Sequence, residues 1–168
     1  PDPTDKSTLK IITQKMKEVD AELGIAFDGD GDRIGVIDKK GRSVAGDLLT
    51  AFLANSIITK EKKNQTVILD IKSSYIAYKK IISMGFKAEI GKTGHSNIKK
   101  RIKEIKSPLA GEMSGHIFFG DRYFGYDDAL YASIRLLELI ANNIELDKFI
   151  STLPKTFISP EIKVFCSD

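Results

Sequence analysis

The stretch GIAFDGDGDRIGVID, residues 24–38, places a short acidic loop between two apolar segments. The apolar letters on either side predict two strands joined by this loop. Inside the loop, Asp28, Asp30 and Asp32 alternate with glycines, whose backbone freedom lets the carboxylates converge on one point. Two carboxylates about 5 Å apart repel by roughly 3 kcal/mol at an effective dielectric of about 20, so three together require a cation or shared protons.

A divalent cation is therefore the first interpretation of the acidic loop. Sets of oxygen ligands suit Mg²⁺, Ca²⁺ or Mn²⁺. An EF-hand calcium loop is excluded, because it needs a glycine and a glutamate where this chain has Arg33 and Lys39. A solvated Asp/Gly turn that binds nothing is the alternative that the sequence leaves open.

The composition indicates a globular chain without a nucleic-acid or membrane partner. Of 168 residues, 42% are apolar and 29% charged, which is typical of a soluble domain with a proper core. A net charge of +3 is too weak to indicate nucleic-acid binding, so the basic runs at 60–63 and 99–103 are predicted to be solvated helix faces. No run approaches the ~18 apolar residues of a membrane span. The single cysteine, Cys166, excludes an internal disulfide framework and suits the reducing cytoplasm.

Both ends of the sequence look cut. PDPTDKS opens the chain without methionine and runs directly into a helical pattern, and PEIKVFCSD, residues 160–168, stops where a predicted strand finishes. We expect a piece of a longer polypeptide, with processed or trimmed ends as the alternative.

Helical and extended patterns alternate along the chain. Apolar residues at helical spacing predict a helix over 7–20, capped by Ser7, and a second helix capped by Asp47. The longest helix follows Asp127 or Asp128 as its N-cap. Further helices are predicted over 75–84 and 93–105, and strands over 23–27, 34–38, 66–71, 86–90 and both sides of the loop in 108–119. This alternation indicates an α/β fold with a mixed, mainly parallel sheet layered with helices.

Four polar loops follow predicted strands. They are DGDGDR (28–33), DIKSS (70–74), GKTGHS (91–96) and GEMSGH (111–116). Ligands of open α/β sheets bind beyond the carboxyl ends of the strands, and loops on one rim can share one site. We therefore expect these loops to form a single functional site.

The GEMSGH loop carries side chains suited to a sugar ring. Glu112 and Ser114 stand two residues apart between glycines, and hydrogen bonds to a charged group contribute ~1.5–3 kcal/mol each. A carboxylate there can orient adjacent sugar hydroxyls. A surface turn with a satisfied glutamate is the alternative.

The GKTGHS loop is suited to an anion. Lys92, Thr93 and His95 stand at a predicted helix start, where backbone N–H groups favour negative charge. The alternatives are a capping or core role for His95, a merely exposed position for Lys72 in DIKSS, and simple neutralisation of the aspartates by Arg33.

One partial resemblance is to haloacid-dehalogenase-type phosphatases. IAFDGDGD resembles their strand followed by Asp-x-Asp-Gly, which would make Asp28 a nucleophile and Asp30 an acid. Asp32 stands where that family has a small hydroxyl or apolar residue. Asp127 and Asp128 open a helical segment, whereas that family's later acidic pair ends a strand. This phosphatase is kept as an alternative.

A closer resemblance covers nearly the whole chain. DGDGDR, KTGHS and GEMSGH, in this order and at this spacing, resemble the α-D-phosphohexomutases, the phosphomannomutase/phosphoglucomutase group. FGYDDALYA, residues 124–132, and the helix after it are also similar. With Met113, the GEMSGH motif resembles that of the branch that acts on glucose and mannose. The phosphoglucosamine branch usually has glutamine at this position.

The resemblance implies a role for each matching residue. Asp28, Asp30 and Asp32 would hold Mg²⁺, whose remaining protein ligand is a phosphoserine. The residues of the catalytic step would be His116, near the reacting hydroxyl, and Arg33, beside the metal. The residues that bind the substrate would be Lys72, Thr93, Gly94, His95, Glu112, Ser114 and His116.

The family enzyme implied by the resemblance has four domains, of which this chain would supply parts. Residues 1–42 would be the end of the second domain with the metal loop, 43–155 the third domain with the sugar loop, and 156–168 a linker or the start of the fourth. The family interconverts hexose 1-phosphates and 6-phosphates, here of glucose or mannose, through a phosphoserine enzyme and a bisphosphorylated sugar.

Two parts of the family's active site have no match in this sequence. They are the nucleophilic serine loop, of Thr-Ala-Ser-His-Asn-Pro type, and the fourth-domain phosphate loop, of Arg-x-Ser-Gly-Thr type. Phosphoryl transfer needs several positioned groups at once. We therefore expect the chain by itself to be inactive, with the remaining domains of the same enzyme as its partner. A sugar- or metal-binding module is the non-enzyme alternative.

Overall fold

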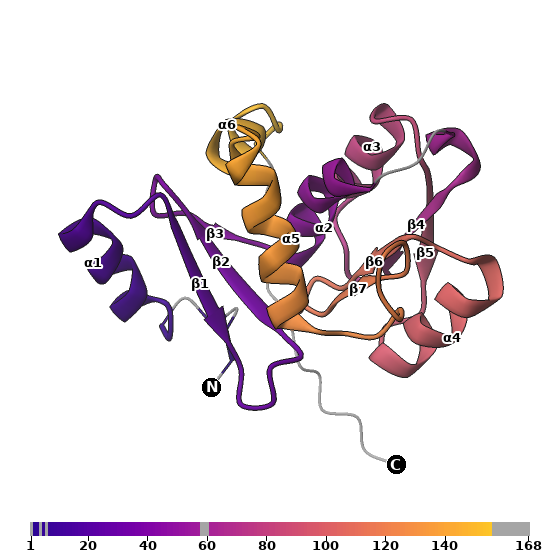
Figure 1. Ribbon diagram of the computed structural model, residues 1–168, viewed down its shortest axis with the longest axis horizontal. Coiled ribbons are helices and arrows are strands. Elements are labelled where there is room, and N and C mark those ends of the chain that lie inside the picture. The colour runs from indigo at the N-terminus through magenta and orange to yellow at the C-terminus, as the bar shows by residue number, and fades with distance from the viewer. Residues whose placement is uncertain (1, 4, 6, 58–60, 156–168) are drawn as a thin grey trace, which may run out of the picture.

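Two β-sheets with helices packed around them form the protein (Figure 1). The computed structural model describes residues 2–155 except 4, 6 and 58–60. The first sheet is antiparallel, in the order β1–β2–β3, with β1 at Leu23–Phe27, β2 at Ile34–Asp38 and β3 at Ser43–Val44. The two strands predicted on either side of the acidic loop are confirmed.

The second sheet has the order β5–β4–β6–β7. β4 (Thr66–Asp70) runs parallel to β5 (Lys87–Gly91) and to β6 (Leu109–Gly111), and β7 (Ile117–Phe119) is antiparallel to β6. The mixed, mainly parallel sheet predicted for an α/β fold is therefore present, and β6 and β7 flank the GEMSGH loop.

Helices connect and cover these strands. They are α1 (Lys10–Val19), α2 (Gly46–Leu53), α3 (Tyr75–Ser83), α4 (His95–Ile105), α5 (Ala129–Ala141) and α6 (Leu146–Ser151), with 3₁₀ turns at Ala54–Ser56 and Lys62–Asn64. Within the part of the chain that the structure describes, none of them is both long and apolar enough to cross a membrane.

Side-chain alternation along β4 gives the second sheet two packed faces. Val67 and Leu69 belong to the larger core, which also contains residues of α2, α3 and α5, whereas Ile68 points to the opposite face. There it packs with Ile98 and Ile102 of α4. The result is three layers, with α4 on one face of the sheet and α2, α3 and α5 on the other (Figure 1).

Helix α5 joins the two sheets. It contacts β2 of the first sheet and β7 of the second, and it lies between the sheets in Figure 1. Ile34 and Val36 of β2 are buried in the same core as Leu136 of α5. The β2–β3 turn is also fixed to α6, because Arg42 Nη2 donates to the carbonyl of Asp147 at 2.9 Å. The two sheets therefore share one core.

Two predicted helix caps are wrong. Helix α1 begins after Leu9 rather than Ser7, and no side chain caps it. Helix α2 begins after Ala45, because Asp47 is drawn into the interior, where its Oδ2 accepts the backbone N–H of Ser74 at 2.7 Å.

The cap predicted for the longest helix is correct for one of its two candidates. Asp128 caps α5, and its Oδ1 accepts the backbone N–H of Tyr131 at 2.8 Å. Helix α6 was not among the predicted elements. The predicted strand in 160–168 and the rest of the segment 156–168 lie outside the described residues.

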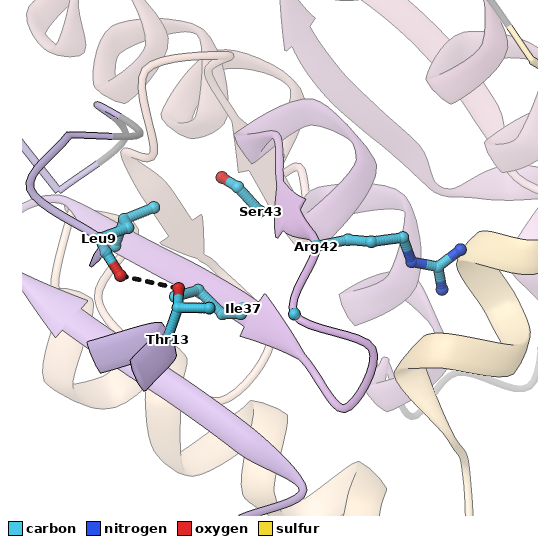
Figure 2. A pocket seen from close by; sticks show the side chains of 6 residues that line it. Leu9, Thr13, Ile37, Arg42 and Ser43 are labelled. Carbon is cyan, nitrogen blue, oxygen red and sulfur yellow. Dashed lines mark hydrogen bonds between the residues drawn. The ribbon is translucent and has the colours of Figure 1, made fainter. Parts of the chain in front are cut away.

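A hollow of about 400 Å³ lies between α1 and the β2–β3 hairpin (Figure 2). Thr13 Oγ1, on its wall, donates to the carbonyl of Leu9 at 2.8 Å. The full lining is Leu9, Thr13, Ile37, Gly41, Arg42 and Ser43. This set contains none of the residues predicted to bind metal or substrate, so the hollow is separate from the predicted site.

Backbone amides are expected to exchange hydrogen at different rates in the two sheets. β4 is paired on both sides and is buried from Val67 to Asp70, whereas β1 is an edge strand of its sheet in the described part of the chain and Phe27 is 39% exposed. Edge strands open locally, whereas buried central strands exchange only through larger unfolding events. Exchange monitored by NMR should therefore be slower in β4 than in β1, and the reverse order would contradict this ranking.

Candidate active site

The acidic loop closes the β1–β2 hairpin. The two strands pair in register up to Phe27 and Ile34, so DGDGDR leaves one strand and enters the other at the same end. Gly31 has a φ of 72°, a conformation that glycine adopts without strain. Carboxylate oxygens of Asp28, Asp30 and Asp32 lie within 4.8 Å of one another. The alternation of Asp and Gly thus brings three carboxylates to one place.

Asp28 is the most enclosed of the three carboxylates, with 2% of its side chain exposed. Its Oδ2 accepts from Arg33 Nε at 2.6 Å, and its Oδ1 accepts from the backbone N–H groups of Asp32 and Arg33 at 3.2 and 3.1 Å. Burial disfavours the charged form, but these hydrogen bonds and the Arg33 guanidinium outweigh it and lower the pKa of Asp28 to about 2. Asp28 is therefore a fixed anion, and Arg33 holds it in place.

Asp32 has the opposite electrostatic environment. Partial burial, its interaction with Asp28 and the charge of Asp30 raise the pKa of Asp32, although His116 opposes them. A negative charge is therefore unfavourable at this position. An all-oxygen set that includes such a carboxylate fits a hard divalent cation such as Mg²⁺, which would relieve the repulsion.

Backbone hydrogen bonds attach the acidic loop to the GEMSGH loop and to α5. Arg33 and His116 form a β-bridge, and the N–H of Ile34 donates to the carbonyl of Gly115 at 3.0 Å. The N–H of Ala129, at the start of α5, donates to the carbonyl of Gly31 at 3.0 Å. Loops that belong to different sheets therefore lie side by side.

Two buried carboxylates connect the loops of the second sheet. Glu112 is 2% exposed, and its Oε1 accepts the N–H of Gly94 at 2.6 Å. Asp70, at the end of β4, is 1% exposed and accepts from Thr93 Oγ1 at 3.2 Å and from the N–H of Met113 at 3.3 Å. The end of β4, the GKTGHS loop and the GEMSGH loop are thus held together by hydrogen bonds.

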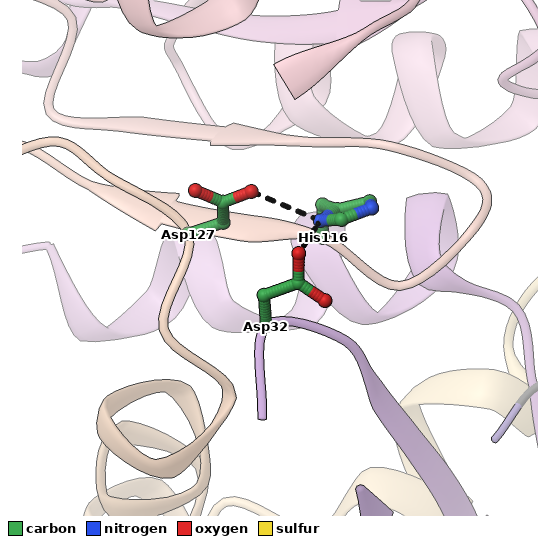
Figure 3. A group of neighbouring side chains, drawn as sticks. All are labelled: Asp32, His116 and Asp127. Carbon is green, nitrogen blue, oxygen red and sulfur yellow. Dashed lines mark hydrogen bonds and ion pairs between the residues drawn. The ribbon is translucent and has the colours of Figure 1, made fainter. Parts of the chain in front are cut away.

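A histidine pair lies next to the acidic loop. The rings of His95 and His116 are nearly parallel, with centroids 6.0 Å apart and 16° between their planes. Nδ1 of His116 lies 3.1 Å from Asp127 Oδ2 and 3.7 Å from Asp32 Oδ2 (Figure 3). Lys99 Nζ lies 3.0 Å from Asp127 Oδ1 and 2.9 Å from His95 Nδ1. One network of polar contacts therefore joins α4, the GEMSGH loop, the segment before α5 and the acidic loop.

Gly46 sets how closely α2 approaches the GEMSGH loop. A Cβ at this position would lie 2.3 Å from the carbonyl oxygen of Glu112 and 2.7 Å from the backbone nitrogen of Gly115. Backbone atoms on both sides leave little room for relaxation, so the close approach requires glycine.

Gly46→Ala is expected to destabilise the chain by ~1–3 kcal/mol, which is the usual cost of overpacking. Urea unfolding measures the change. Gly29→Ala is the matched control, because an added Cβ at Gly29 would meet nothing within 4 Å. Equal stability of the two variants would contradict a tight contact between α2 and the GEMSGH loop.

The structure brings most of the predicted site residues together. Ser114 in the GEMSGH loop and Lys72 in the turn after β4 are exposed, as are Asp30, Thr93 and His95. The residues joined by the contacts described above are Asp28, Asp30, Asp32, Arg33, Thr93, Gly94, His95, Glu112 and His116.

Three residues of this region were missed by the sequence-based predictions. The prediction of a solvated helix face is wrong for Lys99, whose position one turn after His95 was the available signal. Asp127 was predicted only as a possible cap of the longest helix. The available signal was that two acidic residues stand side by side, of which only Asp128 caps the helix. Asp70 had one signal, its place at the end of a buried strand.

Comparison with known proteins identifies the family. The family described as "Phosphoglucomutase/phosphomannomutase, alpha/beta/alpha domain II" matches residues 1–41, and domain III of the same family matches residues 45–157. A phosphoglucomutase from Neisseria meningitidis is 39% identical over 164 residues, which are 98% of this chain and 35% of that protein. A phosphomannomutase/phosphoglucomutase from Pseudomonas aeruginosa is 39% identical over 165 residues, again 98% of this chain and 35% of that protein.

The fold agrees with these sequence matches. A phosphoglucomutase/phosphomannomutase family protein from Burkholderia thailandensis superposes with a TM-score of 0.85 at 38% identity, over 95% of this chain and 35% of that one. This chain thus spans about a third of the length of the relatives it matches. From the family match over most of its length and these identities, we conclude that the chain belongs to the phosphoglucomutase/phosphomannomutase family of α-D-phosphohexomutases and contains sequence of domains II and III.

Proposed function

We propose that this chain is the magnesium- and sugar-binding part of a phosphohexomutase that interconverts hexose 1-phosphates and 6-phosphates. The observation that carries the proposal is the bridge between Arg33 and His116, which joins the acidic loop to the GEMSGH loop. We assign 1–42 to the second domain, 43–155 to the third and 156–168 to a linker or the fourth. The first boundary falls between β2 and β3 of one sheet.

Asp28, Asp30 and Asp32 are the proposed Mg²⁺ ligands, completed in the whole enzyme by a phosphoserine. When bound, the ion would supply positive charge that stabilises phosphoryl oxygens during transfer. The fixed charge of Asp28 and the unfavourable charge of Asp32 support a cation at this place. Because Mg²⁺ loses its water reluctantly and the phosphoserine belongs to another part of the enzyme, binding to this chain is expected to be weak.

The proposed substrate is a glucose or mannose phosphate. Glu112 and Ser114 would hold its hydroxyls, and His116 would exchange a proton with the reacting hydroxyl. Arg33 would serve the reaction by holding Asp28. The other substrate-binding residues would be Lys72, Thr93, Gly94 and His95. The hydrogen bond between Glu112 and Gly94 supports a shared site, since it places the sugar loop beside the helix start proposed for the phosphate.

The remaining domains of the same enzyme are the proposed partner. Leu130, Ile134 and Leu137 form an apolar stripe on α5 and are 61%, 61% and 50% exposed. Among the described residues, β1 is also an edge strand of its sheet. An exposed apolar stripe and an open sheet edge both suit packing against further structure. We propose a cytoplasmic enzyme, and no turnover by this chain, since the nucleophilic serine loop and the phosphate loop have no match in it.

Asp32→Asn is expected to stabilise the chain when divalent cations are absent. Folding raises the pKa of Asp32, so stability from its bound proton is lost as the pH rises, and its charge at neutral pH costs free energy. Removal of an unfavourable charge commonly gains about 0.5 kcal/mol or more. In thermal unfolding without Mg²⁺, the variant should have a higher melting temperature than the parent. Added Mg²⁺ should raise the melting temperature of the parent but not that of the variant. A lower melting temperature for the variant would contradict the electrostatic account.

A phosphatase with Asp28 as nucleophile is not favoured by the geometry. Both oxygens of Asp28 accept hydrogen bonds, from Arg33 Nε and from two backbone N–H groups, and these contacts lower its pKa and stabilise it as a weakly nucleophilic anion. The purified chain, incubated with Mg²⁺ and sugar phosphates, is therefore expected to release no phosphate. Phosphate release that is abolished by Asp28→Asn would overturn the mutase proposal.

Activity can be measured in a chimera, in which this chain replaces the segment it matches in the Pseudomonas aeruginosa relative. We expect the chimera to convert glucose 1-phosphate to glucose 6-phosphate. A folded chimera that binds sugar phosphate without converting it would instead support a non-catalytic binding module.

A further inference from the structure

Asp127 is a carboxylate to which the proposed reaction assigns no role. It lies directly before the cap of α5, and its side chain is 6% exposed. Each of its oxygens has a separate partner: Lys99 Nζ at 3.0 Å on Oδ1, and His116 Nδ1 at 3.1 Å on Oδ2. A buried carboxylate with two such partners can impose hydrogen-bond direction on both of them.

The contact with Asp127 fixes where His116 carries its proton. An ionised carboxylate only accepts hydrogen bonds, so Nδ1 of His116 must be the protonated nitrogen. In a neutral imidazole the other nitrogen, Nε2, then bears the lone pair. Figure 3 shows this second nitrogen on the side of the ring that faces away from Asp127 and Asp32. His116 is thus oriented to accept a proton at Nε2.

The contact with Lys99 has the opposite effect on His95. An ammonium group only donates, so at 2.9 Å the Nδ1 of His95 must be the acceptor and its Nε2 carries the proton. Oδ2 of Asp127 lies 3.6 Å from the same Nδ1, which is too long for a hydrogen bond. His95 is therefore oriented to donate from Nε2.

We propose that Asp127 and Lys99 act as positioning residues that give the two parallel histidines opposite tautomers. His116 presents a proton acceptor and His95 a proton donor, side by side. In the mutase reaction, on whose proposal this step rests, the sugar O–H bond breaks and an N–H bond forms at Nε2 of His116. The hydroxyl oxygen keeps the electron pair and forms a new O–P bond, while the bond between phosphorus and the phosphoserine oxygen breaks and that serine oxygen leaves with its electron pair. The Nε2–H of His95 donates to an oxygen of the bound phosphate, and Asp127 stabilises the imidazolium formed at His116.

Asp127→Asn tests the assignment, because Lys99 dictates how the new amide is oriented. The amide oxygen stays with the Lys99 ammonium, so the NH₂ group faces Nδ1 of His116 and donates to it. Asp32 Oδ2 lies 3.7 Å from the same Nδ1, which is too long for a hydrogen bond that would hold the proton there. The His116 tautomer therefore reverses, which places the proton at Nε2 and removes the acceptor. This reversal is a signature that a merely structural role for Asp127 would not produce.

The experiment is ¹⁵N NMR of the imidazole nitrogens in this chain, at a pH where both rings are neutral. The chain contains two histidines, so the spectrum has one signal set for each. The parent should show one ring protonated at Nδ1 and the other at Nε2. Asp127→Asn should move the His116 proton from Nδ1 to Nε2. Lys99→Met should leave His95 as a mixture of its two tautomers. The exposed controls Asp20→Asn and Lys103→Met should change neither ring.

Two results would overturn the proposal: the same tautomer for both histidines in the parent, or an unchanged His116 in Asp127→Asn. In the chimera, Asp127→Asn should lower kcat by about 100-fold or more and leave KM nearly unchanged. A rise in KM with an unchanged kcat would also count against the proposal. An inactive chimera with the parent sequence would contradict the proposed function, whereas the NMR result on this chain would stand by itself.

Discussion

Arg135→Met is expected to lower the free energy of unfolding by about 3 kcal/mol, because it removes the guanidinium partner of the largely enclosed Asp121 carboxylate. Arg135 lies in α5 and is 2% exposed. Its Nη1 and Nη2 donate to Asp121 at 2.8 and 2.9 Å, and Nη2 also donates to the carbonyl of Ser56 at 2.8 Å. Its guanidinium lies 4.1 Å from the centre of the Phe119 ring. Methionine fills similar space but supplies neither the charge nor the donors.

One donor of Arg135 moderates the expected loss. Its Nε is buried without a hydrogen-bond partner in the described part of the chain, so the substitution also removes a desolvation cost. Urea unfolding measures the net effect. Arg122→Met is the matched control, since Arg122 pairs with Glu138 at the surface and exposed pairs contribute ~0–1 kcal/mol. Equal losses of stability for both variants would contradict the view that Arg135 anchors α5. The N-terminus of this helix directly follows Asp127 and its cap, Asp128.

Glu112→Ala is expected to reduce kcat/KM of the chimera by about 100-fold or more. Hydrogen bonds to a charged group contribute ~1.5–3 kcal/mol each, so the loss of the proposed hydrogen bonds from the sugar hydroxyls to Glu112 corresponds to about this factor. A ring that is not held also cannot be presented in both orientations. In addition, the N–H of Gly94 loses the acceptor that holds the GKTGHS loop against the sugar loop.

Glu112→Gln separates the two roles of this carboxylate. The amide oxygen can still accept the N–H of Gly94, whereas the negative charge is removed. Hydrogen exchange of the Gly94 amide in this chain should accelerate in Glu112→Ala and stay slow in Glu112→Gln. The kcat/KM of the chimera should fall in both variants. Full activity of Glu112→Ala would mean that GEMSGH is only a turn.

The architecture around the site was predictable because its signals are local. A continuous apolar run predicts β4, and glycines between aspartates predict the acidic loop. In both cases residues within a few positions of one another determine the local structure. The meeting of the loops also followed from sequence, since each loop comes directly after a strand. The register that places Arg33 opposite His116 was not predictable, because it depends on how two separate sheets pack around α5.

The features that escaped prediction depend on contacts between distant residues. Asp47 is a typical capping residue, but its carboxylate is used by Ser74, on another helix. Lys99 looks like a solvated lysine until Asp127, which is 28 residues later in the chain, is placed beside it. Short elements behave in the same way, since β3 and α6 carry few residues of their own and are held by contacts such as that of Arg42 with the Asp147 carbonyl.

The central claim is that the acidic loop and the GEMSGH loop serve one mutase transition state. Its most direct test is the rate at which the chimera converts glucose 1-phosphate to glucose 6-phosphate, in the parent, in Asp30→Ala, in Glu112→Ala and in the double variant. We predict conversion by the parent, a large loss in each single variant, and a double variant little worse than either, because groups that act as a unit are not additive. A folded parent chimera without conversion, or full activity of Asp30→Ala, would contradict the claim.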